Sequence, residues 1–185
     1  MKKMDRKLFL QTFLHSPTQV GSVVPSSSFM VREITDLVAK SNPATVVEFG
    51  AGTGVITREL DNYCQENQAK LLTFEKDDKL RDYLKEQFPH LPIFSDALYL
   101  PKVLDEQGIT QVDCIVCGLP FTLFPQQLRE QLFDIIYSTL ADDGALVMYQ
   151  FSWHMRKALK QRFGSVELNF IPLNIPPAFV YYCKK

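Results

Sequence analysis

The chain has 185 residues, close to the length of one domain, and 46% of them are hydrophobic, enough for a substantial core. Its 20 Lys and Arg residues against 21 Asp and Glu residues give a net charge of -1, which argues against a generic nucleic-acid-binding protein. The apolar runs are too short for a transmembrane helix, and the N-terminus lacks the pattern of a secretory signal. Four cysteines are too few for a disulfide scaffold, so a cytoplasmic location is expected.

The N-terminal segment predicts a helix followed by an irregular arm. Residues 1–15 carry basic side chains first and Leu and Phe side chains afterwards, which favours a helix with one basic and one apolar end. Residues 16–25 contain two prolines and a glycine and predict an arm without regular structure. Serines follow Pro25, and apolar side chains with helical spacing then predict a helix over residues 27–40.

After residue 43 the pattern alternates between strands and helices. Strands are expected at residues 44–49, 70–75, 92–97, 112–118 and 145–152. Helices are expected at 54–66 and 77–88, from about 128 to 143, and at 154–163. The tail, 165–173 and 178–184, forms two strands with a short turn between them. This order predicts a doubly wound, seven-stranded, mostly parallel α/β sheet with a C-terminal antiparallel hairpin. Ligands bind at the carboxyl ends of the strands in such sheets.

A glycine-rich turn follows the first strand. It consists of Glu48, Phe49, Gly50, Ala51, Gly52, Thr53 and Gly54. The turn departs from the nicotinamide fingerprint G-x-G-x-x-G, since its third glycine comes one residue early, and it lacks the Gly-Lys-Ser/Thr of a nucleoside-triphosphate loop. It resembles motif I of the class I S-adenosylmethionine-dependent methyltransferases. The resemblance implies that Glu48 faces the methionine ammonium and that the glycines pass under the ribose and the homocysteine part of the cofactor.

Acidic residues follow the next two strands where the same family has them. Glu75-Lys76 ends the second strand, and the resemblance implies that this acid binds both ribose hydroxyls. Asp96-Ala97 ends the third, where the family uses an acid and a backbone amide to bind adenine. Taken singly, each acid is more often a surface charge or a helix cap. Three acids at three successive strand ends predict one cofactor site.

The fourth strand ends at the position where amino-methylating members of the family carry Asn/Asp-Pro-Pro-Tyr/Phe. Here the residues are Cys117, Gly118, Leu119, Pro120 and Phe121. A cysteine replaces the amide, and a thiol is a poor partner for an exocyclic amine, which disfavours adenine as the acceptor. The carbonyl of Gly118 or Leu119 is expected to orient the acceptor amine, while Cys117 borders the cofactor.

Aromatic side chains are candidates for holding a methylated, cationic product. Phe121, Tyr149 and Trp153 lie at strand ends in the predicted order. Packing in the core or at the rim is the alternative role for each. The Cys114-x-x-Cys117 spacing belongs to a strand, no further set of Cys and His with metal-ligand spacing accompanies it, and no metal is expected.

A narrower resemblance covers nearly the whole chain. It is carried by L-H-S-P-T-Q-V-G-S-V-V-P-S-S at residues 14–27, the glycine-rich turn, G-L-P-F-T-L-F-P, Tyr149-Gln150-Phe151 and the final N-I-P-P-A at 174–178. This succession is similar to the bacterial phospholipid N-methyltransferases, which implies the amino headgroup of phosphatidylethanolamine as the acceptor. A single domain over residues 1–185 is then expected, with the Rossmann-like core at 44–185 and residues 1–25 covering the pocket.

A lipid acceptor gives the N-terminal segment two possible roles. Residues 1–14 are expected to contact an anionic membrane, on whose inner face the protein would be peripheral, or else to close over the cofactor. Ser22 and Ser26 are candidates for binding the acceptor phosphate, and a helix cap is the alternative. An rRNA adenine N6-methyltransferase, a small-molecule amine methyltransferase and a non-catalytic cofactor-binding protein stay open as alternative functions.

Overall fold

The computed structural model describes residues 27–185, and the expectations for residues 1–25, including Ser22 and Ser26, lie outside this range. One seven-stranded sheet forms its centre, in the order β3-β2-β1-β4-β5-β7-β6. The strands are β1 (Thr45–Phe49), β2 (Lys70–Phe74), β3 (Ile93–Phe94), β4 (Val112–Cys117), β5 (Leu140–Gln150), β6 (Ser165–Ile171) and β7 (Ala178–Lys184). The first five strands pair in parallel, and β7 runs antiparallel to both of its neighbours. The predicted doubly wound sheet with its C-terminal hairpin is confirmed.

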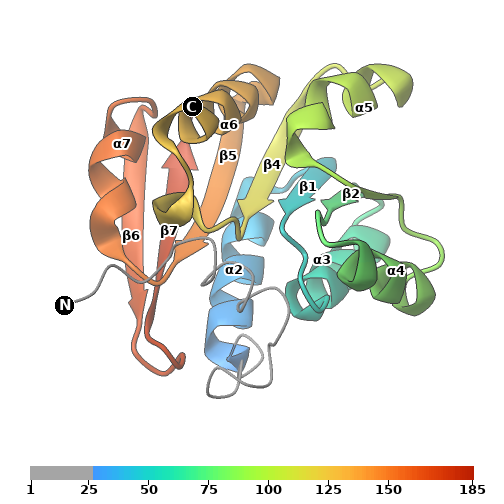
Figure 1. Ribbon diagram of the computed structural model, residues 1–185, viewed down its shortest axis with the longest axis horizontal. Coiled ribbons are helices and arrows are strands. Elements are labelled where there is room, and N and C mark those ends of the chain that lie inside the picture. Colours follow the sequence, from blue (N-terminus) through green and yellow to red (C-terminus); the bar gives the residue numbers. More distant parts are fainter. Residues whose placement is uncertain (1–26) are drawn as a thin grey trace.

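Helices cover both faces of the sheet (Figure 1). Apolar side chains of α2 (Ser28–Ser41) and α3 (Val55–Glu66) pack on one face, and those of α5 (Leu100–Glu106), α6 (Gln126–Thr139) and α7 (Arg156–Lys160) on the other. The remaining helix, α4 (Asp78–Gln87), packs against the turn after β1 through Leu84. Each helix therefore buries an apolar stripe, as its spacing predicts.

The central strand β1 shows how one sequence faces both layers. Val47 and Phe49 belong to the core under α5, α6 and α7, whereas Val46 belongs to the core under α2 and α3. Because side chains alternate along a strand, Glu48 must point toward the α2 and α3 side. Glu48 is the one charged residue in this strand, and it is buried with the apolar ones.

Several elements differ from the prediction. The helix expected at 154–163 is a 3-10 helix, η3 (Trp153–Met155), followed by the five-residue helix α7. The third strand is only two residues long, because the chain turns into a 3-10 helix, η1 (Ala97–Tyr99), capped by Asp96. Helix α5 was not predicted, although its apolar side chains Leu100, Val103 and Leu104 have helical spacing. Helix α6 ends at Thr139, before the Asp-Asp-Gly sequence that favours a turn, and β5 includes that sequence as an irregular stretch between two regular pairings with β4.

Within residues 27–185, none of the helices combines the length and the apolar character needed to cross a membrane. The carboxyl ends of β1, β2, β4 and β5 meet at one edge of the sheet, where Phe49 lies opposite Phe74 and Cys117, and Cys117 lies opposite Met148. The residues that follow these four positions are therefore neighbours in space. They include most of the residues that the sequence analysis selected.

Candidate active site

The turn after β1 is a tight loop that only glycine allows at two positions. Gly50 and Gly54 adopt φ angles of 79° and 82°, in the left-handed region that side-chain-bearing residues avoid. A β-carbon on Gly50 would lie 3.2 Å from the Leu119 side chain, and one on Gly54 would lie 2.8 Å from Leu84. The backbone thus closely approaches helix α4 and the loop after β4, residues 118–121. We call this loop the acceptor loop, after the role expected from the sequence.

Glu48 is a buried carboxylate whose two oxygens differ. The Thr57 hydroxyl donates to Oε2 at 2.8 Å, and the Thr73 hydroxyl donates to the same oxygen at 3.4 Å. The other oxygen, Oε1, is buried and has no hydrogen-bond partner within residues 27–185. Burial raises the pKa of Glu48 from 4.5 to about 7, against the opposing effect of the two threonine hydroxyls, and the charge of Glu75 adds to the rise. An oxygen of this kind is suited to a cationic hydrogen-bond donor.

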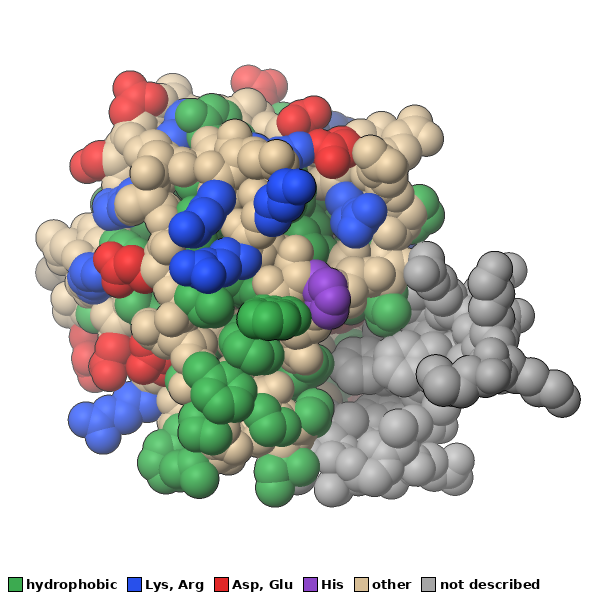
Figure 2. Space-filling view, turned by 90° about the vertical axis from the view of Figure 1, so that its left-hand side faces the viewer, with side chains coloured by type: hydrophobic (Ala, Val, Ile, Leu, Met, Phe, Trp, Pro, Cys, Tyr) green, Lys and Arg blue, Asp and Glu red, His purple; other side chains and the backbone are tan. Residues whose placement is uncertain are grey.

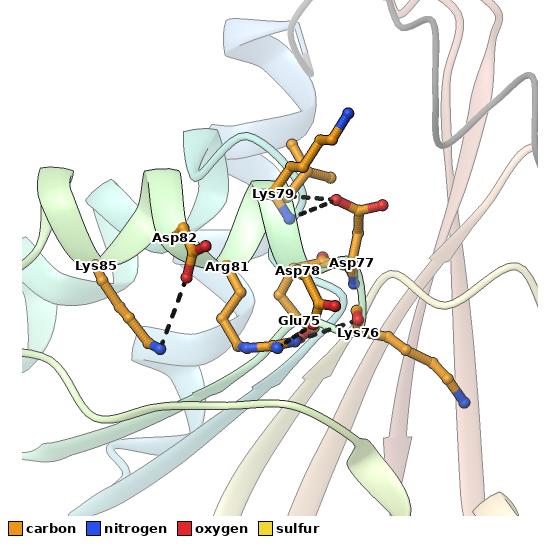
Figure 3. A network of polar contacts seen from close by, with 9 residues as sticks. Glu75, Lys76, Asp77, Asp78, Lys79, Arg81, Asp82 and Lys85 are labelled. Atoms are coloured by element: carbon orange, nitrogen blue, oxygen red, sulfur yellow. Dashed lines mark hydrogen bonds and ion pairs between the residues drawn. The ribbon is translucent and has the colours of Figure 1, made fainter.

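Glu75 connects the end of β2 with the glycine turn. Its Oε2 accepts the backbone N–H of Gly52 at 2.8 Å, and its Oε1 accepts that of Asp77 at 2.9 Å. Figure 3 shows this cluster at the start of α4, with Arg81 beside Glu75 and Asp78, and with the side chain of Lys76 extending away. A carboxylate has about four acceptor positions, so both oxygens keep capacity for hydroxyl donors.

Asp96 lies beyond β3 and caps the short helix that follows. Its Oδ1 accepts the backbone N–H of Leu98 at 3.0 Å, while Oδ2 forms an ion pair with Lys76 Nζ at 2.8 Å. The Asp96 side chain is mostly shielded from solvent, whereas Lys76 is exposed. This ion pair therefore lies at the surface, beside the carboxyl ends of β2 and β3. Ala97, the first residue of the 3-10 helix, is buried.

The acceptor loop after β4 is held from both sides. The Gly118 N–H donates to the Phe49 carbonyl at 2.9 Å, and the Gln150 amide donates to the Leu119 carbonyl at 2.8 Å. The hydroxyl end of Tyr149 lies over Gly118, where any β-carbon would overlap it. Burial raises the pKa of Tyr149, and the nearby charge of Glu48 adds to this effect.

Other residues predicted for the site after β4 and β5 occupy different surroundings. The Cys117 thiol lies in the core under α6, where burial raises its pKa to about 12. The Phe121 ring is also in that core, with centroid distances of 4.7 Å to Phe133 and 5.9 Å to Phe124. Trp153 is 66% exposed beyond the end of β5. Pro120 precedes the 3-10 turn η2 (Phe121–Leu123), so the Pro-aromatic pair shapes the loop.

Sequence reasoning missed Gln150 as a residue of this loop. Gln150 is buried, and its side-chain amide reaches from β5 to the loop after β4. The motif at the end of β4 has Cys117 where amino-methylating relatives carry an amide side chain. The place of Gln150 in the triplet Tyr149-Gln150-Phe151 was the available signal. The pairing that brings it beside Leu119 depends on the sheet register, which no local pattern reveals.

Solved structures with the same fold are methyltransferases. The N-methyltransferase NodS from Bradyrhizobium japonicum, in complex with S-adenosyl-L-homocysteine, superposes with a TM-score of 0.71 at 13% identity over 98% of this chain and 99% of that one. The magnesium protoporphyrin IX methyltransferase of Synechocystis, with bound S-adenosylmethionine, gives a TM-score of 0.66 at 14% identity over 100% and 99%. No model of a known protein family matches the sequence.

A relative identified by sequence decides the family. The chain is 31% identical over 185 residues to a protein named ornithine lipid N-methyltransferase from Singulisphaera acidiphila, covering 97% of this chain and 96% of the relative. The chain belongs to this methyltransferase family. The resemblance drawn from its motifs is thereby confirmed, and this methyltransferase uses S-adenosylmethionine as its cofactor.

The residues at the sheet edge fit that cofactor. Oε1 of Glu48, unpartnered within residues 27–185, is suited to an ammonium group, and the molecule carries one on its methionine part. The glycine turn leads into α3, where backbone N–H groups at a helix start favour polar ligand atoms. No pyrophosphate is involved, in agreement with a turn that departs from the dinucleotide pattern.

Proposed function

We propose that this methyltransferase methylates the amino group of a membrane lipid. The observation that carries the proposal is the relative named ornithine lipid N-methyltransferase, which matches this chain at 31% identity from end to end. Phosphatidylethanolamine, expected from the motifs, and ornithine lipid are the two candidate acceptors. Both present a primary amine at the membrane surface, so one site chemistry suits either lipid.

For the cofactor we propose binding groups on three strands. Glu48 binds the methionine ammonium through Oε1, and Glu75 accepts the ribose hydroxyls through the remaining lone pairs of its carboxylate. Asp96 and Ala97 border the adenine, with Lys76 at the exposed side. The turn formed by Gly50, Ala51, Gly52, Thr53 and Gly54 passes under the middle of the cofactor. When bound, the cofactor supplies a methyl group already activated by its sulfonium.

The protein then has to align a neutral amine and exclude water. An ammonium group must first lose a proton to solvent water, because its lone pair is otherwise occupied. The carbonyl oxygens of Gly118 and Leu119 are suited to accept the remaining N–H groups, and Gln150 fixes the second of them. The hydroxyl end of the Tyr149 ring lies over Gly118. Acceptor roles for Phe121 and Trp153, and a place for Cys117 beside the cofactor, stay predictions.

The test is methyl transfer from labelled S-adenosylmethionine to a panel of acceptors. The panel contains phosphatidylethanolamine and ornithine lipid in detergent micelles, the same micelles without amine lipid, ribosomal RNA, and soluble ethanolamine and ornithine. Label is expected in one or both amine lipids, with S-adenosylhomocysteine formed in equal amount. Label in RNA or in the soluble amines alone would overturn the lipid assignment. Cofactor binding without any S-adenosylhomocysteine would point to a non-catalytic protein.

A further inference from the structure

The exposed apolar side chains of the described residues are unevenly placed. Three of the large ones are tyrosines on different helical segments, each with a polar hydroxyl. The other six have no hydroxyl, and the single polar group among them is the N–H of the tryptophan. They are Phe29, Phe151, Trp153, Phe170, Leu173 and Ile175. Leu173 and Ile175 are 61% and 68% exposed. Such side chains on a soluble surface indicate a contact site when they gather.

The sheet register brings these six side chains to one edge. Phe170 pairs with Phe179, which in turn pairs with Gln150 at the end of β5, so the tip of the β6–β7 hairpin lies at the carboxyl edge. Buried Asn174 in that tip accepts the Ser27 N–H at 2.9 Å, which attaches the tip to the start of α2 near Phe29. The apolar side chains thus lie along the same carboxyl edge of the sheet as the loop that Gln150 holds, the proposed acceptor site.

A basic group lies next to this apolar cluster. Arg156, Lys157 and Lys160 on α7 are exposed, and they form no ion pair with another residue of the range 27–185. Residues 151–166 contain no Asp or Glu, so nothing within this segment offsets their charge. Figure 2 shows Lys and Arg side chains gathered above a group of apolar side chains on one face. We call the six apolar residues together with these three cations the hairpin–α7 surface.

We propose that the hairpin–α7 surface docks on an anionic lipid bilayer. Side chains of the hairpin tip would enter the boundary between headgroups and acyl chains, and the three cations would lie over lipid phosphates. Charge complementarity favours a bilayer. An anionic bilayer has phosphates next to its apolar interior, and this surface has cations next to its apolar side chains. This inference rests on the proposed function, since it places the acceptor loop against the membrane that contains the acceptor.

The experiment is flotation of the full chain with vesicles of phosphatidylcholine alone or mixed with phosphatidylglycerol. The first variant is L173S/I175S, at exposed positions away from the proposed catalytic residues. Binding to anionic vesicles should fall at least about tenfold, because two apolar anchors are lost. The second variant, K157Q/K160Q, should lower binding to anionic vesicles about 25-fold, at about fivefold for each cation, with no change on neutral vesicles. Wild-type binding should weaken in high salt.

Control variants remove an exposed large side chain and two exposed cations elsewhere on the protein. Tyr83→Ser removes an exposed apolar side chain on α4, and K70Q/K102Q removes two exposed cations from β2 and α5. Both control proteins should float like the wild type. Equal loss in the controls, or full binding by L173S/I175S and K157Q/K160Q, would overturn the proposal. Concentration-dependent self-association that L173S/I175S abolishes, without vesicle binding, would assign the surface to a second copy of the chain instead.

Failure of this inference can be separated from failure of the proposed function. Methyl transfer to amine lipids in detergent micelles does not require docking on a bilayer. A wild-type protein that methylates lipid in micelles but does not float refutes the docking surface alone. A protein that floats through these residues yet methylates only soluble amines or RNA refutes the lipid acceptor alone.

Discussion

Replacing Glu48 with Gln should make the cofactor-free protein more stable at alkaline pH and weaken cofactor binding. The carboxyl group is buried, one oxygen has no partner within residues 27–185, and its pKa is raised to about 7. An acid whose folded pKa lies above its unfolded value favours folding while it is protonated. The wild-type protein therefore loses this contribution as pH rises from 4.5 to about 7, and the amide variant does not.

The size of the effect follows from that pKa. A rise from 4.5 to about 7 corresponds to about 3 kcal/mol, because each pKa unit is worth about 1.36 kcal/mol. In the variant, the amide nitrogen takes the place of Oε1, which has no partner within residues 27–185. Burying this unsatisfied donor lowers the free energy of unfolding by about 1 kcal/mol. At pH 8 the variant should gain about 2 kcal/mol in the free energy of unfolding relative to wild type, or about 4–8 °C in melting temperature for a protein of this size. Below pH 4.5 the gain should give way to a loss of about 1 kcal/mol, because only the cost of the amide remains.

Cofactor affinity should change in the opposite direction. Loss of a charge-assisted hydrogen bond to an ammonium group costs about 1.5–3 kcal/mol, which raises the Kd for S-adenosylmethionine about 10- to 100-fold. Since only ionised Glu48 satisfies the ammonium group, wild-type affinity should fall about tenfold for each pH unit below 7, with proton release on binding near that pH. Titration calorimetry in buffers of different ionisation enthalpy measures both quantities.

The matched control is Glu59→Gln, an exposed acid on the same helix as Thr57. It removes the same charge without a buried partner, so neither stability nor affinity should change appreciably. Thermal melts at pH 4.5, 6, 7 and 8 complete the comparison. A Glu48→Gln protein that is less stable than wild type at pH 8, or one that binds the cofactor with unchanged affinity, would refute the reasoning.

Three further substitutions address the acceptor loop and the hairpin. Gly118→Ala places a methyl group where the Tyr149 hydroxyl lies, so methyl transfer should fall at least about tenfold in a label-transfer assay; unchanged activity would exclude a close fit there. Gln150→Leu leaves the Leu119 carbonyl without its donor and should lower kcat about tenfold while the cofactor Kd stays the same, as steady-state kinetics and calorimetry will show. Asn174→Ala removes hydrogen bonds of 2.9 and 2.7 Å and should cost about 2–3 kcal/mol in urea unfolding, and a loss below about 1 kcal/mol would contradict this.

The sequence predicted the sheet because the strands of a buried parallel sheet are continuous apolar runs. It also predicted that Glu48 and Glu75 lie at the ends of β1 and β2, because the glycine-rich motif and the second acid each directly follow an apolar run. The short helix α5 was not predicted, because apolar side chains at only Leu100, Val103 and Leu104 are also compatible with a loop. Helix α6 ends at Thr139 and not near Asp143 as predicted, because β5 already pairs with β4 at Leu140; residues 141–144 form an irregular stretch before the pairing resumes at Ala145.

The acceptor side was harder to predict for the same reason. Cys117 and Phe121 stand in the right sequence positions, yet their side chains turn toward the core under α6. Whether a residue after a strand faces the ligand or the core depends on the parity of the strand and on the loop that follows. Gln150 reaches the acceptor loop only because β5 lies next to β4 in the sheet.

Two carboxylates of the site differ in what they contribute before any ligand binds. Glu75 already accepts two backbone N–H groups, so it stabilises the glycine turn and the start of α4 as part of the fold. Glu48 accepts only hydroxyl bonds on one oxygen and keeps the other buried and unpartnered within residues 27–185. A cation that binds Glu48 therefore offsets a cost that folding has imposed, whereas hydroxyls that bind Glu75 join an existing network. Cofactor binding and folding should consequently be coupled most strongly through Glu48, and the coupling should grow as pH rises through 7.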